Sequence, residues 1–120
     1  MCGIFGVHGH PDAAAVTHLG LYSLQHRGQE SAGIAALDVR GEPHAVRRMG
    51  LVPEGFHGRE MELLRGGAVA IGHTRYSTAG SSTIENAQPV LARSRGGHIA
   101  LAHNGNLTNA AELRFALEEQ

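Results

Sequence analysis

Cysteine, tryptophan and lysine are scarce or missing in this 120-residue sequence, which has one cysteine, no tryptophan and no lysine. A single cysteine excludes a disulfide within the chain, so an apolar core must stabilise the fold, and one domain of this length can bury such a core. Because lysine is missing, all ten basic residues are arginine, and with eleven acidic residues the formal net charge is −1. This balance provides no overall charge that would favour nucleic acid or an anionic membrane surface. We interpret the absence of lysine as a bias of coding composition.

Long hydrophobic runs are missing as well. The apolar run at residues 4–7 is too short for a signal peptide or a transmembrane span. We therefore expect a soluble protein of the reducing cytoplasm, without nucleic-acid or membrane partners. A lipid anchor on Cys2 would need a neighbouring polybasic segment or a second lipid site, and the sequence has neither.

Metal-ligand and phosphate-binding motifs are also missing. The nine histidines are scattered, and His8 and His10 lack the paired spacing and the acidic partners of a zinc site. None of the seventeen glycines belongs to a glycine-rich phosphate-binding fingerprint, so we interpret them as turn residues. We predict no metal site in this chain.

The pattern of apolar and polar residues alternates between strand-like and helix-like periods, which predicts an α+β fold. The expected strands are residues 4–7, 32–39, 45–49, 68–72, 90–92 and 98–103, with turns at 40–43 and 96–97. The expected helices are residues 12–26, residues 54–64 and a last helix after Asn109, and residues 73–89 are expected to form a long loop.

Two of these helices carry further signals. Asp12 is placed as the N-cap of the first helix, one face of which carries Ala15, Leu19 and Tyr22. Asn109 and Glu112 resemble a capping pair for the last helix, whose inward-facing residues are expected to be Leu113, Ala116 and Leu117. The last helix ends without a glycine stop and with acidic residues where the helix dipole favours cations. We therefore expect the chain to be truncated within a larger protein.

The one cysteine stands directly behind Met1. If Met1 is removed, Cys2 carries a thiol and a free α-amine on the same residue. A thiol attacks as its thiolate, and an α-amine that is partly neutral at cytoplasmic pH can take the thiol proton directly or through one water. This arrangement is typical of N-terminal nucleophiles; an incidental cysteine is the alternative.

Three polar stretches are candidates for the rest of a site. LQHRGQES places Arg27 and Gly28 after the first helix, where a glycine either lets the backbone approach a ligand or simply stops the helix. GHTRYSTAGSS holds Arg75 after an apolar strand, either to bind a carboxylate in bidentate fashion or as a solvated loop residue. LAHNGNLTN holds Asn104 and Gly105, whose side-chain amide and backbone N–H can point at one oxyanion, with a hairpin turn as the alternative.

Taken together, the start Met-Cys-Gly-Ile and the stretches LQHRGQES, GHTRYSTAGSS, ENAQPV and LAHNGNLTNAAELR resemble the N-terminal glutaminase domain of the amidophosphoribosyltransferases. The resemblance runs from Met1 to about Arg114. The broader group is that of the N-terminal-nucleophile (class II) glutamine amidotransferases. The resemblance implies their αββα four-layer sandwich, of which residues 1–120 would be a glutaminase domain truncated at its C-terminal side.

The resemblance also implies roles for the residues that match the motifs. Cys2, exposed after removal of Met1, would attack the side-chain amide of L-glutamine, release ammonia and form a glutamyl thioester that water hydrolyses. The oxyanion hole would consist of the Asn104 side chain and the Gly105 N–H.

The substrate-binding residues implied by the resemblance come from two of the stretches. Arg75 would bind the α-carboxylate of glutamine, and Tyr76 and Thr78 would contact or cover the substrate. Arg27 and Gly28 would line the nucleophile, with Gly28 supplying a backbone carbonyl near the reacting amide. An acidic residue for the α-amine would lie beyond residue 120.

In enzymes of this family the ammonia passes through a tunnel to a phosphoribosyltransferase domain, which is absent from residues 1–120. There it displaces pyrophosphate from phosphoribosyl pyrophosphate, and 5-phosphoribosylamine forms in the first committed step of purine biosynthesis. Mg²⁺ is expected in that missing domain, and no cofactor is expected in this segment. An iron–sulfur subgroup of the family uses cysteines that would also lie beyond residue 120. The full-length enzyme is expected to be a homo-oligomer.

Two other functions are compatible with the same residues. One is a class II amidotransferase with another ammonia acceptor, such as a sugar phosphate. The other is a non-catalytic binding module of the same fold, which an unprocessed Met1 would favour because the α-amine would then belong to the wrong residue.

Overall fold

A four-stranded antiparallel sheet lies at the centre of the computed structural model, which describes residues 1–27, 29–77 and 81–119. Its strands are β1 (Gly3–His8), β2 (Ser31–Asp38), β3 (Pro43–Met49) and β4 (Gly66–Arg75), in the spatial order β1-β4-β2-β3. The first and the last of these strands in the sequence are therefore neighbours. The β2–β3 hairpin confirms the pairing that the sequence predicts for residues 32–39 and 45–49.

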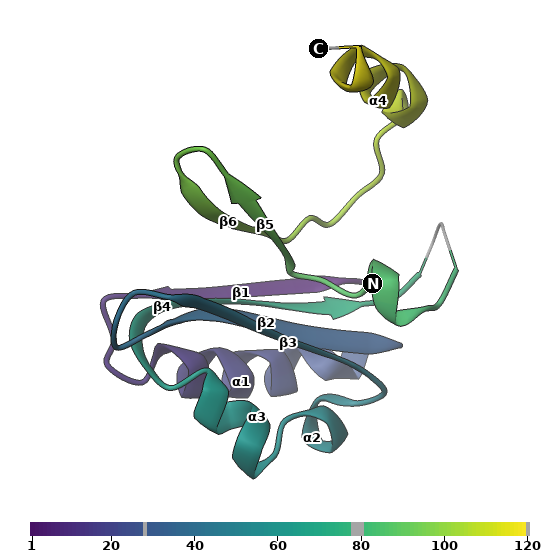
Figure 1. Ribbon diagram of the computed structural model, residues 1–120. Coiled ribbons are helices and arrows are strands. Elements are labelled where there is room, and N and C mark those ends of the chain that lie inside the picture. The colour runs from purple at the N-terminus through teal and green to yellow at the C-terminus, as the bar shows by residue number, and fades with distance from the viewer. Residues whose placement is uncertain (28, 78–80, 120) are drawn as a thin grey trace.

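Helices cover one face of this sheet (Figure 1). They are α1 (Ala13–Leu24), which continues into the short 3₁₀ helix η1 (Gln25–Arg27), and the short helices α2 (Val52–Gly55) and α3 (Gly58–Leu63). Between this layer and the sheet lies the core, whose largest fully buried apolar side chains are Leu21, Ile34, Val52 and Leu64. Gly20 of α1 allows the close approach of β1, because a Cβ atom there would overlap the ring of Phe5.

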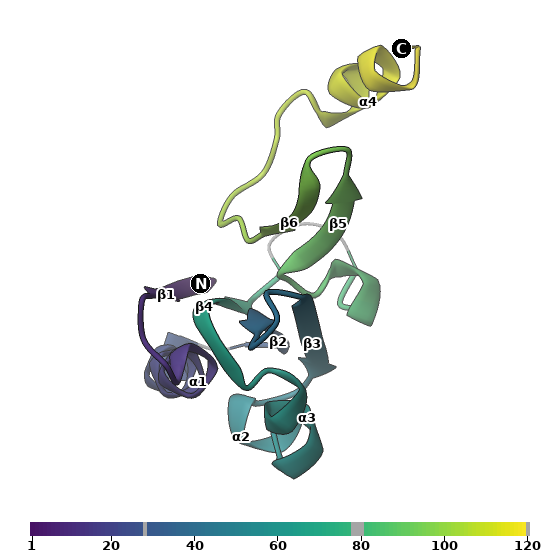
Figure 2. The same cartoon turned by 60° about the vertical axis from the view of Figure 1, so that its left-hand side comes forward.

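On the other side of the sheet lie a hairpin and the last helix (Figures 1 and 2). The hairpin consists of β5 (Val90–Ser94) and β6 (Gly97–Leu101), which confirms the predicted turn around residues 96–97. The 3₁₀ helix η2 (Ile84–Asn86) precedes the hairpin, and α4 (Ala110–Glu118) follows it. None of the residues of α4 is buried.

The face of α1 that carries Ala15, Leu19 and Tyr22 is not the face that packs against the sheet. The buried residues of α1 are Ala13, Ala14, Thr17 and Leu21, whereas Ala15 is exposed and the side chains of Leu19 and Tyr22 are 64% and 52% exposed. The helix is apolar nearly all round, so its sequence contrasts two faces only weakly, and the face with smaller side chains packs against the sheet. Asp12 occupies the N-cap position, but its side chain makes no capping hydrogen bond.

The expected inward face of the last helix is also wrong for the described residues. Leu113 and Leu117 are 43% and 71% exposed, Ala116 is exposed, and the Asn109 side chain makes no capping hydrogen bond. Such an apolar face is buried only where another surface covers it, and the described part of the chain provides none that does so.

Most boundaries differ from the prediction by one or two residues, and two segments differ by more. In place of one helix over residues 54–64 there are two short helices, α2 and α3, because the backbone is extended at His57. The strand expected at residues 68–72 extends from Gly66 to Arg75, so His73, Thr74 and Arg75 belong to the sheet rather than to a loop. The central position of β4, paired with both β1 and β2, holds these polar residues in the ladder.

Candidate active site

The pairing of β1 with β4 brings Cys2 to the end of β4. Gly3 is the register partner of Thr74, so Cys2, one residue before β1 begins, lies beside Arg75 and Tyr76. The Cys2 Sγ accepts a hydrogen bond from the backbone N–H of Tyr76 at 3.4 Å, and the thiol donates to the Tyr76 carbonyl oxygen at 3.4 Å. The thiol is therefore held by main-chain groups across an antiparallel ladder.

Cys2 lies at a pocket of about 180 Å³. The pocket is built where the start of the chain, the end of β4, the segment before β5 and the loop after β6 meet. Its lining residues are Cys2, Arg75, Tyr76, Ser77, Asn86, Gln88, His103, Gly105 and Asn106. This lining is mostly polar and includes one cation, which suits a small ligand with a negative charge and hydrogen-bonding groups.

The cation in this pocket is Arg75, which is only 7% exposed. Its Nη1 donates to the carbonyl oxygen of Ser81 at 3.3 Å and lies 3.9 Å from Oε2 of Glu30. The backbone N–H of Glu30 also donates to the Arg75 carbonyl oxygen at 2.7 Å. These contacts place Nη1 of the guanidinium beside Glu30 and Ser81 at the wall of the pocket.

Glu30 is the anionic partner in this part of the site. The Ser77 hydroxyl lies 2.8 Å and 2.6 Å from the two carboxylate oxygens of Glu30 and donates to this carboxylate. Hydrogen bonds from Ser77 and Ser82, together with the charge of Arg75, lower the pKa of Glu30. The ionised carboxylate therefore ties the residues that follow β4 to the start of β2.

Asn104 reaches the nucleophile from the loop after β6. Its Nδ2 donates to the backbone carbonyl oxygen of Cys2 at 3.2 Å, and its Oδ1 lies 2.9 Å from Nε2 of His73. The next residue, Gly105, has a φ of 144°, which favours glycine. The side-chain amide of Asn104 is therefore held between the Cys2 main chain and a buried histidine of β4.

The segment before β5 is docked on the sheet beside this site. The Arg47 guanidinium donates to the Ala87 carbonyl oxygen at 3.1 Å, and the Gln88 side-chain oxygen accepts from the backbone N–H of His103 at 2.6 Å. A Cβ atom at Gly33 would overlap the carbonyl oxygen of Gln88. Glycine at this position of β2 therefore lets the segment lie flat on the sheet and carry Gln88 into the pocket.

The structure brings together most of the site residues that the sequence predicts. Cys2, Arg75, Tyr76 and Gly105 line one pocket, and Asn104 is hydrogen-bonded to Cys2. Of the remaining predicted residues, Arg27 ends η1, and Gly28 and Thr78 lie outside the described residues.

Sequence reasoning missed His73, Glu30 and Gln88. All three lie inside or beside the stretches that it singled out. His73 and Glu30 each stand two residues from a predicted site residue, Arg75 in GHTRYSTAGSS and Gly28 in LQHRGQES. The sequence signal for such residues is a polar side chain directly before or after an apolar strand. Solvated loops show the same pattern, so this signal does not distinguish a site residue from a loop residue.

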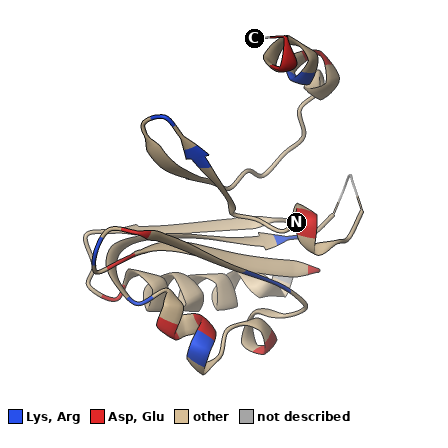
Figure 3. Ribbon diagram, in the orientation of Figure 1, with Lys and Arg blue, Asp and Glu red and all other residues tan. Residues whose placement is uncertain are grey.

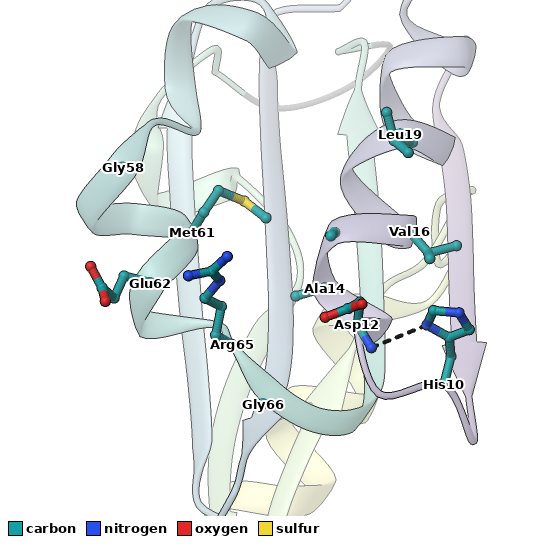
Figure 4. A pocket seen from close by; sticks show the side chains of 11 residues that line it. His10, Asp12, Ala14, Val16, Leu19, Gly58, Met61, Glu62, Arg65 and Gly66 are labelled. Carbon is teal, nitrogen blue, oxygen red and sulfur yellow. Dashed lines mark hydrogen bonds between the residues drawn. The ribbon is translucent and has the colours of Figure 1, made fainter.

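A second and larger pocket, of about 630 Å³, lies on the helical side of the molecule between α1 and α3 (Figure 4). Its walls carry charges of both signs, from Asp12, Glu62 and Arg65, and His10 Nδ1 accepts a hydrogen bond from the Asp12 backbone N–H at 3.1 Å. None of the predicted site residues that the structure describes lines it. The pocket at Cys2 is therefore the better candidate for chemistry.

Acidic and basic residues are interspersed over the helical side, and arginines lie at the β5–β6 hairpin (Figure 3). One pair, Arg48 and Glu60, forms a salt bridge of 3.0 Å between β3 and α3. Across residues 1–27, 29–77 and 81–119, no helix has the length and apolarity required to span a bilayer. The same residues contain no cluster of three or more metal-ligating side chains.

The chain is similar in sequence to proteins named amidophosphoribosyltransferase. It is 53% identical to the protein from Lacticaseibacillus casei, and the match covers 99% of this chain and 61% of that protein. It is 52% identical to the protein from Archaeoglobus fulgidus, with coverage of 100% and 26%, and 51% identical to that from Bacillus subtilis, with coverage of 99% and 25%. The chain thus spans about a quarter of the length of the last two relatives. No protein-family model matches it.

Two solved structures share the fold. One is described as the allosteric regulatory enzyme of purine biosynthesis; it aligns with a TM-score of 0.85 at 48% identity, over 99% of this chain and 25% of that chain. The other is glutamine phosphoribosylpyrophosphate amidotransferase from B. subtilis complexed with ADP and GMP, with a TM-score of 0.82 at 47% identity and coverage of 99% and 25%. These likenesses confirm the α+β fold class predicted from the sequence.

Proposed function

Over its whole length this chain is homologous to the amidophosphoribosyltransferases, and we propose that it is the glutaminase portion of such an enzyme. The observation that carries the proposal is the Cys2 thiol at a small polar pocket whose wall holds the buried Arg75 guanidinium. A nucleophile and a cation that line the same small pocket suit an amino acid with a reactive side-chain amide.

The reaction begins at the Cys2 thiol once Met1 has been removed. The α-amine of Cys2 takes the thiol proton, and the sulfur attacks the side-chain carbonyl carbon of L-glutamine. The proton then passes to the leaving amide nitrogen, ammonia departs, and a glutamyl thioester remains. Water hydrolyses this thioester to glutamate and restores the thiol. The Tyr76 backbone, hydrogen-bonded to the sulfur, holds the nucleophile in place for both steps.

Arg75 binds the α-carboxylate of the substrate. The fork of a guanidinium matches a carboxylate in bidentate fashion, and the low exposure of Arg75 strengthens the pairing. Tyr76, 45% exposed beside the pocket, covers the substrate. Arg27, Gly28 and Thr78 complete the substrate-binding set by analogy with the motif residues of the family.

Asn104 and Gly105 stabilise the oxyanion of the tetrahedral intermediate. The Asn104 amide nitrogen donates to the carbonyl oxygen of Cys2, the same residue that carries the attacking sulfur. The Gly105 backbone N–H is the second donor. Such pre-oriented donors act on the charge that develops as the sulfur attacks.

In the full-length protein the ammonia serves a phosphoribosyltransferase domain outside residues 1–120. That domain, with Mg²⁺, converts phosphoribosyl pyrophosphate to 5-phosphoribosylamine in the first committed step of purine biosynthesis. The enzyme is cytoplasmic and homo-oligomeric, and it binds neither nucleic acid nor membrane. No cofactor belongs to this segment, whose one cysteine serves as the nucleophile.

An electrophilic glutamine analogue tests this proposal in the full-length protein. Mass spectrometry should find one label per chain on Cys2, an N-terminus that begins at Cys2, and no label in a Cys2→Ser variant. Labelling that survives the Cys2→Ser substitution would overturn the assignment of the nucleophile. Glutamine-dependent phosphoribosylamine formation that is lost in this variant, while ammonia-dependent formation continues, would support the proposed division of labour.

A further inference from the structure

His73 is a buried polar residue to which the proposed reaction gives no role. It is 0% exposed in β4, where its register partners are Ile4 of β1 and Gly33 of β2. Burial is the main cause that lowers the pKa of His73, against the hydrogen bond to Asn104 and a weaker interaction with the His103 backbone, which raise it. The lowered pKa favours the neutral imidazole, which carries one proton.

The contact with Asn104 decides where that proton sits. The Asn104 amide nitrogen must face the Cys2 carbonyl oxygen, 3.2 Å away, because the flipped amide would set two acceptor oxygens against each other. The amide oxygen then faces His73 Nε2 at 2.9 Å, so Nε2 carries the proton and donates. The other ring nitrogen, Nδ1, is buried without a hydrogen-bond partner among the described residues.

We infer that His73 is a positioning residue, which fixes the side-chain amide of Asn104 so that its N–H groups face the nucleophile. This inference rests on the proposed oxyanion role of Asn104. The amide nitrogen has two hydrogens and one partner among the described residues, the Cys2 carbonyl oxygen, which leaves the second hydrogen for the oxyanion. A donor on the amide oxygen also polarises the amide and strengthens its N–H groups as donors.

The placement of the two residues explains why such a device is needed. Asn104 belongs to an exposed loop, whereas His73 is fixed in a strand that is paired on both sides. The hydrogen bond between them therefore holds the side chain of a loop residue at a fixed place relative to the sheet. An apolar side chain at this position would avoid the unpartnered buried Nδ1, so packing alone does not account for a histidine here.

A double-mutant cycle in the full-length enzyme separates positioning from packing. His73→Leu removes the donor and should lower the glutamine-dependent kcat about 10- to 100-fold, as loss of an orienting partner typically does. Because the substrate contacts remain, KM should change by less than about twofold. His73→Gln, whose amide nitrogen can replace Nε2–H, should restore most of kcat. The double variant His73→Leu with Asn104→Ala should be no slower than Asn104→Ala alone.

His18 provides a matched control. It is a half-buried histidine of α1 whose Nε2 likewise has no partner within residues 1–27, 29–77 and 81–119, and its ring lies 5.7 Å from that of Phe56 in the helical layer. His18→Leu makes the same chemical change away from the pocket and should leave glutamine-dependent kcat within about twofold of wild type.

Three outcomes would contradict the inference. Losses that multiply in the double variant, or a His73→Gln enzyme as slow as His73→Leu with an unchanged melting temperature, would show that His73 acts independently of Asn104. These results would leave the proposed function intact. An Asn104→Ala enzyme with full kcat would overturn the oxyanion role itself, and the positioning role with it.

Discussion

The sulfur of Cys2 lies 3.4 Å from both the amide nitrogen and the carbonyl oxygen of Tyr76. Main-chain groups therefore hold the nucleophile, and the register of β1 against β4 fixes which residue meets it. No described side-chain base contacts the thiol. In the proposed reaction this leaves the α-amine of the same residue to accept the proton, so processing of the N-terminus becomes part of catalysis.

Retention of Met1 should abolish glutamine hydrolysis in the full-length enzyme. With Met1 attached, the nitrogen of Cys2 is an amide that cannot accept a proton, although the strand pairing from Gly3 onward is unchanged. Ammonia-dependent phosphoribosylamine synthesis should persist, since it bypasses the glutamine pocket. A protein that keeps Met1 by intact mass and still hydrolyses glutamine at the wild-type rate would require a different base.

Arg75→Lys and Asn104→Ala should affect different kinetic constants. The α-carboxylate keeps its charge throughout the reaction, so loss of the guanidinium fork in Arg75→Lys should mainly raise KM. The oxyanion exists only after attack, so Asn104→Ala should lower kcat by about 10²–10³ with little change in KM.

Steady-state kinetics with glutamine, and with ammonia as control, measure this difference. If Arg75→Lys lost kcat at constant KM while Asn104→Ala only raised KM, the two proposed roles would be reversed.

Glu30 should make stability depend on acidity. Its folded-state pKa is lowered by the Ser77 and Ser82 hydrogen bonds, so its ionised form stabilises the fold above its ordinary pKa, and this contribution is lost as pH falls through the lowered value. The difference in unfolding free energy between wild type and Glu30→Gln should therefore be present at about pH 7 and shrink below about pH 4.

Denaturant titrations across this pH range provide the measurement. Ser77→Ala, which removes the first of these hydrogen bonds, should change the profile in the same direction and to a smaller extent. A difference between wild type and Glu30→Gln that grows on acidification would contradict the assignment.

Gly33→Ala should displace the segment that carries Gln88 into the pocket. The new Cβ atom would overlap the Gln88 carbonyl oxygen, so the segment must move or β2 must distort. Overpacking of this kind typically lowers the free energy of unfolding by about 1–3 kcal/mol, so we expect a lower melting temperature. We also expect a higher KM for glutamine. Gly6→Ala in β1 is the matched control, because its Cβ atom would meet only ordinary contacts, the nearest at 3.7 Å. Equal behaviour of the two variants would argue against this role of Gly33.

The sequence predicted the parts of this site that depend on local chemistry. Cys2 behind Met1, Arg75 among hydroxyls and the Asn104-Gly105 pair each stood out from their neighbours, and the strand pairs at both hairpins followed from turn residues and alternation. The site residues that the sequence analysis missed depend on contacts with residues far away in the sequence. His73 follows an apolar run and precedes polar residues, and only the pairing of β4 on both sides draws it into the sheet.

The buried faces of the helices could not be predicted from the sequence, for the same physical reason. In α1, apolar residues surround the axis, so the side that is buried depends on which side chains the sheet can accommodate. Glu30 and Gln88 are ordinary polar residues in the sequence. Their contacts with Ser77 and His103 exist only because strands far apart in the chain are neighbours.

Cys2 adjoins an edge of the sheet, because β1 pairs with β4 alone among the described strands. Hydrogen bonds at a sheet edge open more readily than those of a strand paired on both sides, so exchange of the β1 amide hydrogens with solvent requires less free energy than exchange in β4. The reactive sulfur therefore adjoins a part of the molecule that can fray while the core stays intact. Because the thiol already lines a pocket in the folded protein, its alkylation by a simple haloacetamide requires no global unfolding under native conditions.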